Sequence, residues 1–284
     1  MRTAFATCSA MPEGAPDDQL AAQLLGAEFA VWDDPSVDWA AYDRVVLRSV
    51  RDYSRRLDEF LAWTTAVGPE RLRNRPDLVA FNADKRYLGE LPAQTVPTAL
   101  IEPGEELPGF DGEFVVKPNV SAGARDTGRF GAGDLEAARA LVDRIHAAGK
   151  VALVQPYLST IESDGETALV FLGGELSHVL HKRPVLRDRG VAPIAPGELQ
   201  VAAAMLEDDL VTAGSADPDQ EAFAREVVEE ITARFDLPLY ARVDIVRGAD
   251  GAPLLLELEV TEPALYLATS PGAAERFAAA VRAS

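Results

Sequence analysis

Cysteine is nearly absent from this sequence. Cys8 is the single cysteine among 284 residues, so a disulfide framework or a thiolate zinc site cannot form within one chain. This scarcity favours a reducing compartment. There are only three histidines, and no two of them have the setting of a zinc site. We therefore expect His146, His178 and His181 to be structural. No Ser/His or Cys/His nucleophile arrangement stands out either.

Positive charge and long apolar runs are scarce as well. Lys and Arg total 27 against 46 Asp and Glu, which gives a formal net charge of −19. A nucleic-acid-binding surface needs clustered basic residues, so this balance argues against a nucleic-acid partner. No stretch approaches the roughly 20 apolar residues of a membrane span, and the N-terminus lacks a long apolar core. We expect a cytoplasmic protein that does not engage a membrane.

Strand-like and helix-like segments alternate along the chain, which predicts an α/β fold. Near the N-terminus, strands are expected at 2–8, 28–33 and 44–50 and helices at 17–26 and 54–67. This is the pattern of a small doubly wound unit.

Three regions are predicted from these patterns: 1–75, 76–158 and 159–284. The second region contains a strand and small-residue loop at 113–130 and a helix at 134–149. The third region holds two candidate hairpins and a helix at 221–235.

The last candidate hairpin, 240–260, carries the strongest chemical signal. A two-residue turn at Asp250-Gly251 would place four charged side chains on one face. These are Arg242, Asp244, Glu257 and Glu259. The other face would carry Val243, Ile245, Leu256 and Leu258. Opposed carboxylates need a compensating cation, and Mg²⁺ prefers oxygen ligands, so we predict a magnesium site. The alternative is a solvated acidic face on which Arg242 merely pairs with Glu259.

A lysine at the end of a buried strand is a second chemical signal. Lys117 precedes the small residues Ser121, Ala122 and Gly123, so the spacing is not that of a Walker-type phosphate loop. Lys117 can still reach nucleotide phosphates, and the small residues let backbone N–H groups approach them. The alternative is a strand-end lysine in water beside an ordinary turn.

Five segments, taken in order, resemble the ATP-grasp superfamily of ligases. They are NADKRYLGEL, FVVKP with its small-residue loop, LVQPYL, GETALVFLGGELSHVLHKRP, and ARVDIV followed by LLLELEVTEPALYL. The resemblance spans essentially the whole chain. It is closest to a branch related to prokaryotic glutathione synthetases, which includes the O-ureido-serine cyclo-ligase of cycloserine biosynthesis. It implies a pre-ATP-grasp domain at 1–75, a small subdomain at 76–158 and a large subdomain at 159–284.

The resemblance also implies cofactors, ATP and Mg²⁺, and roles for individual residues. Lys85 and Lys117 would lie near the ATP phosphates. Gln155, Tyr157 and Leu158 would form the adenine hinge, and Glu162 would meet the ribose. Asp244, Glu257 and Glu259 match the metal-ligand positions, although relatives commonly have Asn at the last of these.

A cation is expected on the same face as Glu166, which belongs to the nucleotide side of the site. Glutathione synthetases have an arginine where this chain has Ala168, so Lys182 or Arg183 must supply the charge. A two-residue turn at 173–174 would favour Arg183, whereas the family match prefers Lys182, which we follow. Arg242 could stabilise the transferring phosphoryl group.

The substrate is expected at the N-terminal edge, since α/β sheets usually bind ligands at the carboxyl ends of their strands. Arg48, Ser49 and Tyr53 follow or end the third strand, and Arg48 could hold a substrate carboxylate. The alternative is an arginine that caps a helix region or pairs with Asp52. Relatives have RSTWDY where this chain has RSVRDY, so substrate preference is expected to differ.

The implied reaction is carboxylate activation by ATP, followed by attack of an amine and release of ADP and phosphate. The predicted substrate is a small amino-acid-like molecule, joined to a second molecule or cyclised on itself. Two other functions stay open: a small-molecule kinase on the same fold, and an ATP-binding module without turnover. A homodimer is compatible with the sequence, which does not fix the oligomeric state.

Overall fold

Three β-sheets organise the chain in the computed structural model, which describes residues 1–284. The first sheet is parallel and has the strand order β2-β1-β3-β4. Its strands are β1 (Thr3–Thr7), β2 (Glu28–Val31), β3 (Arg44–Ser49) and β4 (Leu72–Arg73). Helix α1 (Gln19–Leu25) packs on one face with Phe5 and Val46, and α2 (Leu57–Val67) lies on the face of Ala4 and Val45. The predicted doubly wound unit is therefore present.

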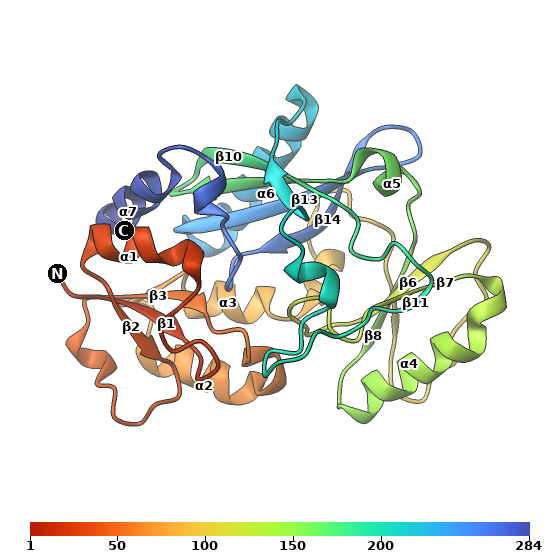
Figure 1. The fold of residues 1–284 in the computed structure, drawn as a ribbon, viewed down its shortest axis with the longest axis horizontal. Coiled ribbons are helices and arrows are strands. Elements are labelled where there is room, and N and C mark those ends of the chain that lie inside the picture. Colours follow the sequence, from red (N-terminus) through yellow and green to blue (C-terminus); the bar gives the residue numbers. More distant parts are fainter.

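The second sheet is antiparallel and forms a separate lobe at the right of Figure 1. Its strands run in the order β11 (Gly190–Val191), β7 (Gly128–Phe130), β6 (Phe114–Pro118), β8 (Ala152–Pro156) and β5 (Ala99–Ile101). The apolar face of α4 (Leu135–Ala147) covers the sheet with Leu141 and Ile145. Strand β11 belongs to the predicted region 159–284, yet it pairs in the second sheet. The predicted region boundaries therefore do not fully match the division into sheets.

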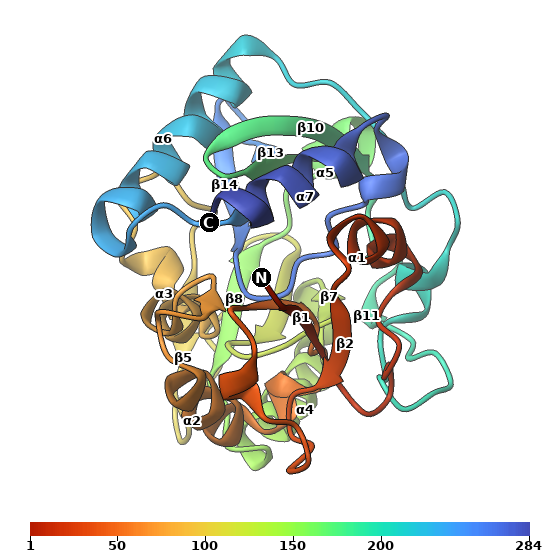
Figure 2. The ribbon, with the colours of Figure 1, turned by 90° about the vertical axis from the view of Figure 1, so that its left-hand side faces the viewer.

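The third sheet is also antiparallel, and it is covered on both faces. Its order is β12 (Val211–Ala213), β10 (Glu175–Lys182), β9 (Glu166–Leu172), β13 (Tyr240–Arg247) and β14 (Pro253–Glu259). Helix α6 (Pro218–Phe235) packs on the face of Phe171 and Val243, whereas α7 (Ala273–Ala283) packs on the face of Val170 and Tyr240. Figure 2 shows α7 lying beside α1, which joins this sheet to the first.

Short helices make most of the connections. The remaining α-helices are α3 (Pro76–Asn82) and α5 (Thr160–Asp164). The 3₁₀ helices are η1 (Pro16–Asp18), η2 (Trp39–Ala41), η3 (Tyr53–Arg55), η4 (Lys85–Gly89), η5 (Ala132–Asp134), η6 (Ala203–Leu206) and η7 (Leu267–Thr269). None of the helices combines the length and apolar character needed to cross a membrane.

The turn of the β13–β14 hairpin differs from the prediction, yet the predicted pairing is present. Gly248 N donates to Ala252 O at 2.8 Å, and Gly251 has φ +81°, so the loop has three residues instead of two. A bulge between Asp244 and Ile245 restores the register, and Asp244 faces Glu257 as predicted. The bulge also turns Leu255 into the core in place of the predicted Leu256.

The β9–β10 hairpin has a bulge of its own, and this bulge decides between two candidate cations. The register shifts between Leu176 and His178, so that Lys182 pairs opposite Glu166. An unbulged hairpin would have favoured Arg183. That residue instead points to the exposed Glu207.

Candidate active site

A cavity of about 640 Å³ lies where the three sheets meet. Its wall includes most of the residues predicted from the sequence. They are Tyr53, Lys85, Lys117, Ser121, Ala122, Gly123, Gln155, Tyr157, Leu158, Glu166, Lys182, Arg242, Glu257 and Glu259. The cavity therefore gathers residues that are far apart in the chain.

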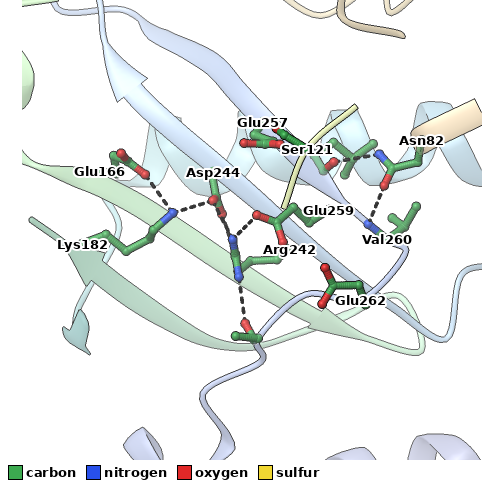
Figure 3. Close-up of polar contacts among 12 residues, drawn as sticks. Asn82, Ser121, Glu166, Lys182, Arg242, Asp244, Glu257, Glu259, Val260 and Glu262 are labelled. Atoms are coloured by element: carbon green, nitrogen blue, oxygen red, sulfur yellow. Dashed lines mark hydrogen bonds and ion pairs between the residues drawn. The ribbon is translucent and has the colours of Figure 1, made fainter. Parts of the chain in front are cut away.

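Seven charged residues gather at this cavity, five in one ion-pair network and two in the separate Lys85–Glu257 pair, and we call the seven the charge cluster. They are Lys85, Glu166, Lys182, Arg242, Asp244, Glu257 and Glu259. Lys182 Nζ donates to Asp244 Oδ2 at 2.7 Å and contacts Glu166 Oε2 at 2.8 Å (Figure 3). Arg242 donates to both oxygens of Asp244, at 2.8 and 3.0 Å. Arg242 also pairs with Glu259 and donates to Ala264 O.

Burial makes these charges depend on one another. Burial by itself would raise the pKa of Asp244, but Arg242 and Lys182 hold that pKa below its usual range. Burial would likewise lower the pKa of Lys182, which Asp244 and Glu166 raise instead. The pKa of Glu259 rises to about 7, because burial and the neighbouring carboxylates outweigh Arg242. Asp244, Lys182 and Arg242 therefore keep their charges at neutral pH.

Two lysines face the cavity, Lys117 from β6 of the second sheet and Lys85 from η4. Lys85 Nζ contacts Glu257 Oε1 at 3.0 Å and donates to Ser121 Oγ at 3.2 Å. Lys117 is 9 % exposed, and no carboxylate lies within 4.0 Å of its ammonium group. Burial lowers the pKa of Lys117, with Glu257 opposing that shift. Lys117 is thus a buried cation that the chain leaves without an ion pair.

The small-residue loop after Lys117 needs its glycine. Gly123 has φ +65°, and a Cβ atom there would lie 2.5 Å from Val201 Cγ1. Val201 belongs to a segment, 184–206, that runs across the cavity and lines it with apolar side chains. Ala202 N donates to Gly123 O at 2.8 Å, which fastens this covering segment to the loop.

The predicted hinge lines the cavity, but the predicted ribose ligand does not. Leu158 lies two residues after β8, and its N–H donates no hydrogen bond within the chain, so it is free to bind a ligand. Glu162 lies outside the cavity wall with its side chain 54 % exposed, and it pairs with Arg129 at 2.8 Å. Helix α5 thus places Glu162 beside Arg129 of the neighbouring lobe, and its contact with a ribose stays a prediction.

The three predicted metal ligands do not form a three-carboxylate metal site in this arrangement. Asp244 is 1 % exposed, and both of its oxygens are occupied by Arg242 and Lys182. Amino and guanidinium groups therefore supply the charge compensation that the sequence suggested for a metal. Glu257 and Glu259 do line the cavity, with side chains 27 % and 30 % exposed. Two such carboxylates suit Mg²⁺, which usually binds one or two carboxylates together with phosphates and water.

The expected substrate residues are mostly buried away from the cavity. Arg48 is 2 % exposed, pairs with Asp18 at 2.8 Å, and lies 5.4 Å from the ring centres of Tyr240 and Phe277. Ser49 is fully buried and accepts a hydrogen bond from Ala15 N. The Arg48 side chain thus ends in the core, paired with Asp18, and its binding of a substrate carboxylate stays an untested prediction.

Sequence reasoning missed a polar group at the N-terminal end of the cavity. It consists of Asp17, Arg51 and Glu262, which all line the wall. A usable signal was present: β3 ends at Ser49, and residues just beyond a parallel strand reach the ligand-binding edge. Arg51 meets that condition, whereas Arg48 lies inside the strand.

Comparison with known proteins agrees with this fold. The model of the D-cycloserine synthetase DcsG N-terminal domain matches residues 3–74. The cycloserine biosynthesis protein DcsG of Streptomyces lavendulae is 35 % identical over 274 residues, covering 90 % of this chain and 88 % of that protein. The crystal structure of D-cycloserine synthetase DcsG superposes with a TM-score of 0.84 at 32 % identity, over 99 % of this chain and 98 % of that one.

More distant structures share the fold alone. An ATP-grasp protein with a RimK domain from Sphaerobacter thermophilus has a TM-score of 0.65 at 16 % identity, covering 99 % of this chain and 100 % of that one. The ATP complex of D-alanine–D-alanine ligase from Bacillus anthracis has a TM-score of 0.62 at 13 % identity, covering 99 % and 95 %.

Fold and site together define an ATP-grasp enzyme, an ATP-dependent ligase. The chain belongs to the family of the cycloserine biosynthesis protein DcsG.

Proposed function

We propose that this enzyme uses ATP and Mg²⁺ to activate a substrate carboxylate as an acylphosphate, which an amine then attacks with release of ADP and phosphate. The observation that carries the proposal is the convergence of Lys85, Lys117, Lys182 and Arg242 on one cavity that also holds Glu257 and Glu259. Phosphoryl transfer needs such positioned charges more than it needs a protein nucleophile. No Cys or His lines the cavity.

Each part of the cavity has a task in this proposal. Lys117, which has no ion pair of its own, binds phosphate oxygens, and Lys85 exchanges part of its contact with Glu257 for a phosphate. The free N–H of Leu158 reads the adenine edge. Glu257 and Glu259 are the residues that would hold Mg²⁺, which would supply positive charge beside the phosphates. Lys182 and Asp244 fix the position of Arg242, whose guanidinium faces the reacting groups.

The relative DcsG is a cycloserine biosynthesis protein, and we extend that role to this chain as part of the proposal. Its substrate would be a small amino-acid-like molecule. The cavity volume of about 640 Å³ is sufficient for a nucleotide and a small second molecule. When amine and carboxylate belong to one molecule, the enzyme acts as a cyclo-ligase.

The test is to trap the activated carboxylate. Hydroxylamine added to a turnover mixture should give a hydroxamate, with ADP and orthophosphate formed in equal amounts. A cyclo-ligase should release ADP with a single substrate, whereas an intermolecular ligase needs two. Formation of AMP and pyrophosphate would contradict the acylphosphate. A stable phosphorylated product that hydroxylamine cannot convert would identify a kinase instead.

A further inference from the structure

Strand β14 lies at the edge of the third sheet, and its outer side is covered in two different ways. The strand pairs with β13 on one side only. Near its start, the main chain of residues 94–96 covers the outer side, with Leu255 N donating to Gln94 O at 2.8 Å. Beyond Leu255, side chains from another part of the chain cover it instead. The change occurs where Glu257 and Glu259 line the cavity.

Tyr87 binds both main-chain groups of Leu258, the residue between the two carboxylates. Its hydroxyl accepts a hydrogen bond from Leu258 N at 2.7 Å and donates one to Leu258 O at 2.9 Å. Asn82 Nδ2 donates to Leu258 O at 2.7 Å, and Asn82 Oδ1 accepts from Val260 N at 3.1 Å (Figure 3). Tyr87 is 1 % exposed and Asn82 is 8 % exposed, so water competes little for these bonds. The strand is therefore fixed on both sides of Glu259.

The segment that carries these two side chains also carries Lys85. Lys85 Nζ lies 3.0 Å from Glu257 Oε1. Lys85 N donates to Asn119 O at 2.9 Å, directly after β6, and Asn119 Nδ2 donates to Asp84 Oδ2 at 2.8 Å. Residues 82–87 therefore link the second sheet to the edge of β14, and they fix the position of Lys85 relative to the two carboxylates.

We propose that Asn82 and Tyr87 are positioning residues, which hold Glu257 and Glu259 where both can contact one divalent cation. The inference rests on the proposed function, in which these carboxylates are the Mg²⁺ ligands, and it adds the residues that aim them. Mg²⁺ demands near-ideal octahedral geometry, so displacement of a ligand lowers the affinity. Removing a group that orients metal ligands typically costs about 10- to 100-fold in metal affinity.

A side chain that merely covered the strand edge would act on folding alone. Tyr87→Phe keeps the ring in the core and leaves Leu258 N without a partner, while Leu258 O keeps its bond from Asn82. An unpaired buried N–H is costly, so the strand end should shift and displace the carboxylates on either side of Leu258. Lys117 is not part of this strand. Metal-dependent binding of a nucleotide should therefore weaken, whereas metal-free binding should not.

Calorimetry with a non-hydrolysable ATP analogue, carried out in excess Mg²⁺ and again in EDTA, measures this difference. The wild type should bind more tightly with Mg²⁺, and the ratio of the two affinities is the metal-dependent gain. Tyr87→Phe should lower the gain by about 10-fold or more and leave the affinity in EDTA unchanged. Asn82→Ala removes the acceptor of Val260 N and should lower the gain as well. In the matched control, Tyr42→Phe, both affinities should stay as in the wild type. Tyr42 is 8 % exposed, and its hydroxyl donates to Glu28 Oε2 of β2 at 2.9 Å.

Glu257→Gln separates this inference from the proposed function. It should lose most of the metal-dependent gain. If it keeps the wild-type gain, the metal assignment of the proposed function fails, and the positioning role fails with it. If Glu257→Gln loses the gain while Tyr87→Phe and Asn82→Ala keep it, only the positioning role is overturned. An affinity of Tyr87→Phe that falls equally in Mg²⁺ and in EDTA would also overturn that role, since the side chain would then support the fold alone.

Discussion

The charged side chains are closely paired at one end of the cavity and poorly paired at the other. In the charge cluster every carboxylate has a cation at 3.0 Å or less, on Lys85, Lys182 or Arg242. At the other end, which Asp17, Arg51 and Glu262 line, the one ion pair is Arg51 with Glu262, and it is 3.9 Å long. The paired end can keep its geometry before any ligand arrives, as electrostatic catalysis requires. The unpaired end is costly to maintain until a ligand completes its hydrogen bonds.

The largest expected effect comes from breaking the paired end. Asp244→Ala leaves Lys182 and Arg242 as buried cations without their shared partner, so the free energy of unfolding should fall by about 3–5 kcal/mol. Urea unfolding in metal-free buffer measures this change. Asp209→Ala is the matched control, because Asp209 pairs with Arg183 but is 72 % exposed, and its loss should cost at most about 1 kcal/mol. Equal losses in both variants would refute the distinction.

Glu257→Gln should affect turnover more than folding. The side chain lines the cavity and its pairing with Lys85 is partly exposed, so a neutral isostere preserves the packing. ADP release should fall about 100- to 1000-fold, as for other lost groups that act on developing charge, and the Mg²⁺ requirement should increase. Steady-state assays over a magnesium titration test both points. Glu175→Gln, on an exposed hairpin end, should behave like the wild type. Normal turnover by the Glu257 variant would end its assignment to Mg²⁺.

The next variant, Lys117→Met, tests a lysine that faces the same end of the cavity as the charge cluster but forms no ion pair. Its removal should weaken ATP binding by about 1.5–3 kcal/mol, the range for hydrogen bonds to charged groups. Adenosine lacks phosphates, so its affinity should change little in the same calorimetric titration. If adenosine and ATP lose affinity equally, then Lys117 supports the fold and does not contact phosphate.

The smallest effect concerns Lys150, which is partly buried beside the small-residue loop. Its Nζ donates to Ser54 O in η3 and to Val120 O in that loop. Burial lowers its pKa to about 8, below the usual value of 10.5. The unfolded chain then binds more protons between pH 8 and 10.5, so stability should rise with pH across that window. Lys150→Met should lack this part of the rise. Parallel pH profiles for the two proteins would contradict the assignment.

Periodicity and turn residues predicted the helices and the parallel sheet, because these depend on local pattern. They failed where one residue shifts a register. The extra residue near Ser177 reverses which cation faces the cavity, and the one near Leu256 changes only which leucine packs in the core, and nothing in their composition marks a bulge. At the first hairpin the family match chose Lys182, where the turn alone favoured Arg183.

Arg48 shows a different limit. Its strand and its charge were predicted correctly, but the face on which it lies is covered by Phe277 of α7, more than two hundred residues further along the chain. Local sequence carries no information about which helix will cover a strand. The same holds for Glu162, whose partner Arg129 comes from another lobe. Long-range packing therefore determines where both side chains lie.

The covering segment has a consequence for motion. Its middle is hydrogen-bonded to the second lobe. Strand β11 pairs with β7, Ala192 N donates to Thr127 O, and Ala202 N donates to Gly123 O. Its two ends are tied together beside the third sheet, where Arg183 N donates to Leu210 O at 2.9 Å. A rotation of one lobe against the other must therefore bend the chain near 184–189 and 203–209. In native-state hydrogen exchange, we expect the amides of Ala192 and Ala202 to open together with β7.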